Sequence, residues 1–240
     1  MSILVLPGDK IPPEVLPVPS NPSASLKLGP GLRHIPPSTI IPVLAGPLRV
    51  DHKKNAIWVE SKRGRYIPQA NDAVIAVVHH SATDYYSCSI TPHTAFALLP
   101  QLAFEGATKK TRPQLAPGSL VYARISSASK HMDPELVCYN PSTGKSDGMG
   151  ELKGGTLFEL SLGMCRRLLM SRQDGGVVVL EEIAAKIPFE VAIGRNGVIW
   201  VKAGTIKETL VVRNALQETD STDLGVVEQE KLVKKLLRHI

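Results

Sequence analysis

The sequence has few of the residues from which disulfide frameworks, metal cages and membrane spans are built. Its 240 residues include three cysteines, Cys88, Cys138 and Cys165, which lie far apart and form no C-x-x-C pair. A zinc cage or a disulfide framework is therefore not expected, and a reducing compartment such as the cytosol or nucleus fits better. No run approaches the roughly 18 consecutive apolar residues of a membrane span, so no membrane partner is expected. The first ten residues have no basic segment before their apolar residues and soon reach Pro7, which argues against a signal peptide.

Catalytic signatures are also missing. The sequence contains no H-E-x-x-H, no G-x-S-x-G, no Ser-His-Asp pattern and no acidic cluster of the kind that holds two metal ions in nucleases. His79 and His80 are adjacent in an expected strand, where side chains face opposite sides and fail to chelate one ion. Residues 144–146 (Gly-Lys-Ser) resemble the end of a P-loop, but Tyr139 replaces the first glycine and no helix start follows. We therefore expect no catalysis, no metal and no cofactor.

Proline and glycine are frequent in the first 60 residues, where proline excludes helix interiors and both favour loops and short strands. The segment 48–61, LRVDHKKNAIWVES, predicts two strands around a turn at residues 52–55. Such a segment has little core of its own. We expect an N-terminal β domain over residues 1–60 that packs against a neighbouring protein.

Short strands punctuated by turn-forming residues follow from residue 61 to residue 147. Candidates include DAVIAVVHHS, DYYSCSIT, GSLVYARISSAS and ELVCYN. Several short strands of this kind suggest a small barrel or sandwich, and a five-stranded OB barrel has about this size. We therefore assign residues 61–147 to an OB-fold barrel.

The last part, residues 148–240, mixes helices with a strand pair, which suits a KH-like domain. Residues 154–171 predict a helix, with Thr156 as N-cap and Glu159 completing a capping box. Further helices are expected at residues 177–187, 205–218 and 226–240. The strand candidates FEVAI and VIWV lie between the helices expected at residues 177–187 and 205–218. The fold class expected for the chain is thus mainly β with an α+β C-terminal part.

Positive charge is in excess, and few acids oppose it in the expected barrel. The chain has 28 Lys and Arg against 22 Asp and Glu, a net charge of +6, and its only acids between residues 61 and 130 are Asp72, Asp84 and Glu105. Such an excess permits a polyanionic partner. An OB barrel binds single strands along a charged groove, with aromatic rings for the bases. Two basic groups are candidates for RNA phosphates, and four tyrosines are candidate rings: Lys62, Arg63 and Arg65; Lys109, Lys110 and Arg112; Tyr66, Tyr85, Tyr86 and Tyr122. The alternative for both basic groups is a solvated loop.

The tetrapeptide Gly194-Arg195-Asn196-Gly197 allows two interpretations. G-x-x-G spacing is the signature of the KH loop that clamps four backbone nucleotides of single-stranded RNA. Asn-Gly between two apolar runs is also the strongest short-range signal for a β-hairpin, with φ > 0 at both residues in a type I′ turn. Because the flanking segments have strand character, we favour the structural turn, with Arg195 still a candidate phosphate contact.

Several segments together resemble the cap subunits of the eukaryotic RNA exosome. They are VLPGD, LKLGPGL, RYIPQANDAVIAVV, KKTRPQLAPGSLVYARI, STGKSDGMG and FEVAIGRNGVIWVK, and they run nearly from end to end. The last is the most specific, since this family carries G-x-N-G followed by an aromatic strand at this point. The resemblance implies an N-terminal β domain, an S1-type OB fold, a KH domain and a non-catalytic role.

The resemblance also implies partners and a place in the cell. Cap subunits of this family sit on a ring of RNase PH-like proteins beside other cap subunits, and RNA passes through the ring to a separate 3′→5′ exoribonuclease. The family acts in ribosomal RNA processing and RNA degradation, in nucleus, nucleolus and cytoplasm. By this resemblance Lys109, Lys110 and Arg112 lie at the pore, and the first basic group is the weaker candidate. The alternative is a stand-alone single-stranded RNA-binding adaptor that uses the KH loop.

Overall fold

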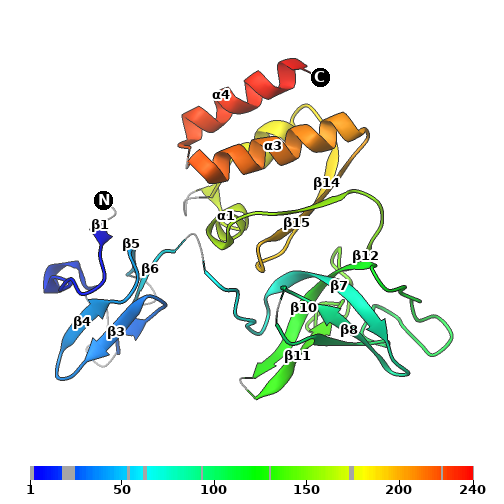
Figure 1. Ribbon diagram of the computed structural model, residues 1–240, viewed down its shortest axis with the longest axis horizontal. Helices are drawn as coiled ribbons and strands as arrows, with labels where there is room; N and C mark the ends of the chain where they lie inside the picture. Colours follow the sequence, from blue (N-terminus) through cyan, green and yellow to red (C-terminus); the bar gives the residue numbers. More distant parts are fainter. Residues whose placement is uncertain are drawn as a thin grey trace. The chain divides into compact units, whose positions relative to one another are not determined.

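The computed structural model describes residues 3–17, 25–52, 55–61, 64–92, 94–129, 131–172, 176–222 and 224–239. The chain folds into two compact units, Met1–Gly64 and Arg65–Ile240 (Figure 1). No helix in these ranges is long and apolar enough to cross a membrane. The division into three domains after residues 60 and 147 stays a prediction.

The first unit consists of short strands around a small core. Its elements are β1 (Ile3–Val5), the 3-10 helix η1 (Pro13–Val15), β2 (Lys27–Leu28), β3 (Leu32–Ile35), β4 (Thr39–Pro42), β5 (Gly46–Asp51) and β6 (Ala56–Val59). One sheet has the order β1-β5-β6-β2, and β3 pairs with β4. The antiparallel pair β5–β6 confirms the two strands expected in residues 48–61. Its main apolar cluster has three buried members, Val5, Leu48 and Val59.

Five strands of the second unit close into a barrel. They are β7 (Ala73–Ser81), β8 (Tyr85–Ser89), β9 (Ala97–Pro100), β10 (Leu120–Ser129) and β11 (Met132–Val137). The order β11-β9-β8-β7-β10 is closed by pairing of β10 with β11. The β9–β11 pair is parallel and the other four pairs of the barrel are antiparallel. A closed five-stranded barrel of this kind confirms the OB-type fold expected from the strand spacing.

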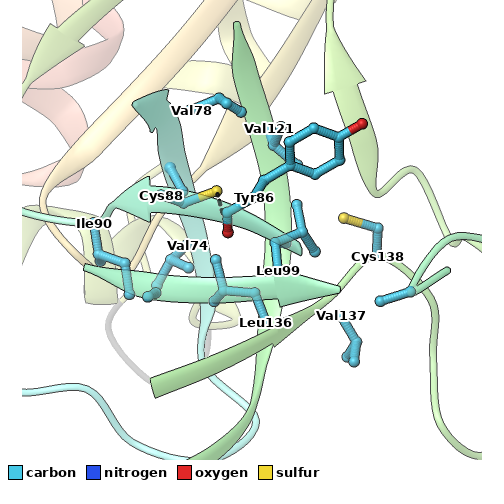
Figure 2. Close-up of a cluster of buried hydrophobic side chains, with 14 of the residues drawn as sticks. Val74, Val78, Tyr86, Cys88, Ile90, Leu99, Val121, Leu136, Val137 and Cys138 are labelled. Atoms are coloured by element: carbon cyan, nitrogen blue, oxygen red, sulfur yellow. Dashed lines mark hydrogen bonds between the residues drawn. The ribbon is translucent and has the colours of Figure 1, made fainter. Parts of the chain in front are cut away.

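Alternate residues of each strand fill the barrel. In β10 the inward residues Val121, Ala123 and Ile125 are buried, because successive side chains of a strand point to opposite faces. Figure 2 shows this core, in which Cys88 and Cys138 lie among aliphatic side chains from the other strands. The inward-facing apolar side chains of these short strands therefore form the barrel core. The outward-facing side chains of β8 and β9 remain available for contacts with other molecules.

The three cysteines are all buried and free. Burial raises the pKa of the Cys88 and Cys165 thiols to about 12, and it also raises that of Cys138. Because the thiolate is the reactive form, we expect a thiol reagent at about pH 8 to label none of them in the native chain and all three in denaturant. Rapid labelling of any thiol without denaturant would contradict their placement.

The rest of the second unit is a three-stranded sheet with helices. Its elements are β12 (Gly150–Leu152), β13 (Thr156–Glu159), α1 (Leu162–Leu168), α2 (Val179–Ala184), β14 (Phe189–Ile193), β15 (Val198–Ala203), α3 (Ile206–Thr222), α4 (Val226–Leu236) and the 3-10 turn η3 (Leu237–His239). The sheet order is β13-β15-β14, while β12 joins the barrel beside β10. Helix α3 packs on β15, and α4 packs on α2 and α3 (Figure 1). The strand pair β14–β15 and the last two helices lie where the sequence predicts them.

The predicted helix over residues 154–171 is wrong in its first half. Thr156 to Glu159 form β13, which pairs with β15. The helix begins only at Leu162, and its N-cap is Ser161, whose hydroxyl accepts the Met164 N–H at 3.1 Å. The apolar spacing of this segment fits a strand of alternating exposure as well as a helix, and pairing with β15 decides between them.

Candidate nucleic-acid interface

The loop between β9 and β10 carries the second basic group on a self-bonded turn. The Thr108 N–H donates to the Thr111 hydroxyl (3.0 Å), and the Thr111 N–H donates to the Thr108 carbonyl (3.1 Å). The two hydroxyls also lie 2.9 Å apart. Lys109 and Lys110 occupy the positions between these threonines and are exposed. Neither ammonium pairs with a carboxylate in the part of the chain that the structure describes. The ordered turn therefore presents two positive charges that can bind an anion.

Arg112 fastens this turn to the connection between β7 and β8. Its N–H donates to the Thr108 carbonyl at 2.9 Å, and its guanidinium donates to the side-chain oxygen of Gln101. Gln101 is buried; its amide donates to the Ala82 carbonyl (2.8 Å) and its N–H to the Asp84 carbonyl (2.9 Å). Because Ala82 and Asp84 belong to the β7–β8 connection, the basic turn and that connection form one edge of the barrel. The β7–β8 connection joins the first two strands of the barrel. In OB folds the loop between the first two strands borders the face that binds oligonucleotides.

Thr111→Val tests whether this ordered turn positions the two lysines. Valine keeps the shape of the side chain but cannot accept the Thr108 N–H, a loss of about 1 kcal/mol at most in an exposed turn. We expect the affinity for single-stranded RNA to fall about three- to fivefold, since ordering the turn then costs part of the binding energy. Fluorescence anisotropy measures this, with Thr143→Val, in a different exposed loop, as the matched control. Equal affinities for the two variants would contradict a positioning role.

The outer face of β8 starts at the same edge. Side chains alternate along this strand, so Tyr85, Ser87 and Ser89 face outward while their neighbours enter the core. The Tyr85 side chain is 42% exposed, and the serines are half-buried. The small serine side chains leave room beside the Tyr85 ring for a flat group such as a base.

Phe96 and His79 add an aromatic pair to the barrel surface. Phe96, the residue before β9, is 42% exposed, and its ring centroid lies 4.8 Å from that of His79 with an interplanar angle of 35°. Such rings are platforms on which bases of any sequence stack. The sequence reasoning missed Phe96 and weighed His79 only as a metal ligand. The available signal was the position of Phe96 directly before the alternating strand ALLP, which places it on the outward side.

Two of the four tyrosines proposed as platforms, Tyr66 and Tyr86, are buried in the protein interior, so their prediction is wrong, and a third, Tyr122, is only partly accessible. The Tyr66 hydroxyl donates to Asp72 at 2.8 Å, and burial together with this bond raises the pKa of Tyr66. Tyr86 is 3% exposed and donates to a backbone carbonyl in the β9–β10 loop at 2.7 Å. Tyr122 is half-buried, and its hydroxyl lies 3.4 Å from a backbone carbonyl of β14. Of the four, Tyr85 alone has a freely exposed ring.

The first basic group is described only in part. Arg65 is exposed at the start of the second unit. Lys62 and Arg63 lie outside the described residues. A contact of either basic group with RNA therefore stays a prediction at this point.

The tetrapeptide 194–197 joins β14 to β15 as a hairpin tip. The Gly194 N–H donates to the Val198 carbonyl (2.8 Å), and the Gly197 N–H donates to the Gly194 carbonyl (3.2 Å). Gly197 alone of the four has a positive φ, +85°. This is the pattern of a three-residue hairpin loop that ends on a left-handed glycine. The hairpin agrees with the favoured interpretation, whereas the predicted type I′ turn, with positive φ at Asn196 too, is wrong.

The Asn196 side chain turns into the protein and completes β7. It is 5% exposed. Its carboxamide oxygen accepts the Ile75 N–H (3.3 Å), and its nitrogen donates to the carbonyls of Ile75 (2.9 Å) and Ile90 (2.6 Å). Since β8 pairs with β7 only from Val77 onward, the carboxamide takes the place of a neighbouring strand at Ile75. The turn is thus a joint between the barrel and the three-stranded sheet.

Arg195 and Gly194 strengthen this joint. The Arg195 N–H donates to the Ala73 carbonyl (2.8 Å), and its guanidinium lies 2.9 Å from buried Asp72. A Cβ on Gly194 would lie 2.2 Å from the Asn196 oxygen, so only glycine fits there. The backbone N–H groups of residues 194, 195 and 197 are therefore all occupied within the protein. A KH loop that clamps RNA has to present such groups to phosphates.

Comparison with known proteins connects these features to one family. Three family models match: "Exosome complex exonuclease Rrp40 N-terminal domain" over residues 26–65, "Exosome complex component RRP40, S1 domain" over residues 66–150, and "KH domain" over residues 155–207. A solved structure described as that of an exosome complex RNA-binding protein shares the fold, with a TM-score of 0.57 at 19% identity. It covers 73% of this chain and 97% of its own.

Curated relatives match over nearly the full length. Exosome complex component RRP40 of Drosophila melanogaster is 40% identical over 237 residues, which are 98% of this chain and 96% of the relative. The Schizosaccharomyces pombe protein of the same description is 36% identical, with coverage of 98% and 94%. That of Saccharomyces cerevisiae is 36% identical, with coverage of 91% and 89%. With family models over most of residues 26–207 and a relative that is 40% identical over 98% of this chain, the chain belongs to the RRP40 family of exosome complex components.

Proposed function

We propose that the chain is an RNA-binding subunit of an exosome complex, which guides single-stranded RNA without selecting its sequence. Membership of the RRP40 family supports the complex, and the S1 and KH family models support RNA as the ligand. The observation that carries the proposal is the basic turn: Lys109 and Lys110 stand exposed on an ordered edge of an OB barrel. Phosphate contacts of this kind position a strand but carry no sequence information.

The chemistry of the turn suits a strand that has to slide. Each lysine offers a compact, mobile point charge to a phosphate, while the Arg112 guanidinium keeps N–H groups beyond the one that it donates to Gln101. Tyr85 and the Phe96–His79 pair offer stacking surfaces on the barrel. None of these contacts requires a particular base edge, so binding is weak, sensitive to salt and tolerant of sequence.

The first unit supplies the contact with the complex in this proposal. Its core is small, and it exposes apolar side chains near its start, including Leu4 at 71%. Exposed apolar side chains gathered in one region favour a protein interface. We assign to this unit the contact with RNase PH-like ring subunits, beside other cap subunits and with a separate 3′→5′ exoribonuclease downstream. The setting is ribosomal RNA processing and RNA degradation in nucleus, nucleolus and cytoplasm.

Purification of the tagged chain from its own cells tests the assembly. Mass spectrometry of the co-purified proteins is expected to identify RNase PH-like proteins in amounts close to that of the chain, and imaging of the tagged chain locates it in the cell. Recovery of the chain alone, or with unrelated RNA-binding proteins, would instead support a stand-alone adaptor.

We also propose that the chain guides RNA without cutting it. Across the described ranges, no group of three or more His, Cys, Asp and Glu side chains is placed to hold a metal ion. Incubation of the purified chain with end-labelled RNA and either Mg²⁺ or Mn²⁺ is expected to leave the RNA intact. Shortened products that disappear on further purification of the chain would point to a contaminant, whereas products that persist would overturn the proposal.

A further inference from the structure

Four cations form a stripe along the outer face of the last helix. Lys231, Lys234 and Lys235 of α4 and Arg238 of η3 follow at spacings of three, one and three residues. Residues three, four and seven apart lie on one helix face. All four side chains are exposed. None of them pairs with a carboxylate in the described part of the chain, and residues 231–240 contain no Asp or Glu. We call these four residues the α4 stripe.

The helix that carries the α4 stripe is firmly held on its other face. Leu232 and Val233 are buried. Gln229 is 1% exposed; its side-chain oxygen accepts the Val178 N–H (3.1 Å) and its nitrogen donates to the Leu224 carbonyl (2.8 Å). These anchors fix the rotation of α4 about its axis, so the cations are presented away from the core. Figure 1 shows α4 at the periphery of the second unit, beside α3.

The two acids of α4 do not neutralise the α4 stripe. Glu228 accepts the Gly225 N–H at 2.9 Å and so caps the start of the helix. Glu230 lies 3.9 Å from Arg172. Both precede Lys231, so negative charge gathers at one end of α4 and positive charge at the other. Cations near a helix C-terminus also interact favourably with its dipole, an effect on stability that the experiment below separates from binding.

We propose that the α4 stripe binds the phosphate backbone of RNA, as a second contact apart from the basic turn of the barrel. Three of its four cations are lysines, which suit phosphates but are depleted at the centres of protein interfaces. The stripe contains no aromatic anchor, the usual hot spot of a protein partner. At about 1.5 Å per residue it is about 10 Å long, room for on the order of three phosphates. The inference rests on the proposed function only in that the chain handles RNA.

Neutralising the α4 stripe tests this proposal in the full chain. Lys231→Gln, Lys234→Gln, Lys235→Gln and Arg238→Gln are combined, and binding to a labelled single-stranded RNA of mixed sequence is measured at several salt concentrations. We expect affinity to fall at least about fivefold, and the salt slope to decrease by about 0.7 for each phosphate that the stripe no longer binds. The control combines Lys10→Gln, Lys27→Gln, Lys186→Gln and Lys202→Gln, exposed residues whose replacement changes the net charge equally. We expect less than a twofold effect from it.

The outcomes separate this proposal from its alternatives. Equal losses in the stripe variant and the control would reduce the effect to net charge and overturn the proposal, as would unchanged affinity of the stripe variant. Tighter binding of a poly-glutamate peptide than of RNA would make an acidic protein the ligand and overturn it too. Should the fourfold variant unfold, Lys234→Gln with Lys235→Gln is expected to show about half the effect on the salt slope. Lack of any RNA binding by the unsubstituted chain would instead overturn the proposed function.

Discussion

Replacing Asn196 with alanine is expected to lower the free energy of unfolding by about 3 to 5 kcal/mol, a large effect for a single polar side chain. The carboxamide satisfies the Ile75 N–H and the carbonyls of Ile75 and Ile90, all in the buried joint between barrel and sheet. Alanine leaves these three groups without partners, and each buried unsatisfied group costs about 1 to 3 kcal/mol. Although residues 194–197 have the G-x-x-G spacing of an RNA-binding KH loop, we therefore expect substitution of Asn196 to lower stability in the first place.

Urea denaturation followed by circular dichroism measures this effect. Asn214→Ala is the matched control, because Asn214 is exposed on α3 and alanine is the better helix former. It should be neutral or slightly stabilising. A variant at Asn196 that keeps full stability but loses RNA affinity would contradict the structural joint and favour an adaptor that reads RNA through the KH loop.

Reversing the charge of the basic turn has the largest expected effect on RNA binding. With Lys109→Glu, Lys110→Glu and Arg112→Glu combined, the affinity of the isolated chain for single-stranded RNA should fall about 100-fold at about 0.1 M salt. Three phosphate contacts of about 1 kcal/mol each account for this size. The salt slope should decrease by about 2, since each single-strand contact contributes about 0.7. Replacing the two lysines should change stability little, because they are exposed and make no ion pair among the described residues. Replacing Arg112 removes its hydrogen bond to buried Gln101, so we expect the triple variant to lose about 1 to 3 kcal/mol of stability and still to fold.

Fluorescence anisotropy over a range of salt concentrations gives both quantities. The control reverses Lys27, Lys186 and Lys202, three exposed lysines, and so has the same net charge. A decrease of similar size in the control would mean that binding follows net charge alone. It would also remove the reason for placing RNA at the barrel edge.

The strand and helix pattern was predictable where local signals agree with the tertiary contacts. Strand β10 alternates between buried and partly exposed residues, β7 is a short apolar run bounded by turn-forming residues, and α4 has a clear apolar face. The segment at Thr156 failed because its spacing serves a strand as well as a helix, and its partner β15 lies some 40 residues away in sequence. The pairing with β15 that selects the strand over the helix could not be predicted from the sequence of the segment alone.

The candidate site was predictable as charge but not as geometry. The sequence locates Lys109 and Lys110 in a basic loop, yet the bonds that order this loop depend on Gln101 and on the β7–β8 connection. Tyr86 was misplaced because adjacent tyrosines on a strand must face opposite sides, and sequence alone does not say which one enters the core. Asn196 was placed correctly in a hairpin, but its bonds to Ile75 span 121 residues.

Degradation of threaded RNA by the assembled complex tests the central claim most directly. A complex reconstituted with Lys109→Glu, Lys110→Glu and Arg112→Glu is compared with the unsubstituted complex, after size-exclusion chromatography has shown equal assembly. We expect a long single-stranded RNA to be degraded at least about tenfold more slowly at limiting RNA, because fewer strands are captured at the barrel edge. Degradation at the unsubstituted rate by the fully assembled complex would contradict the claim that this basic turn guides RNA.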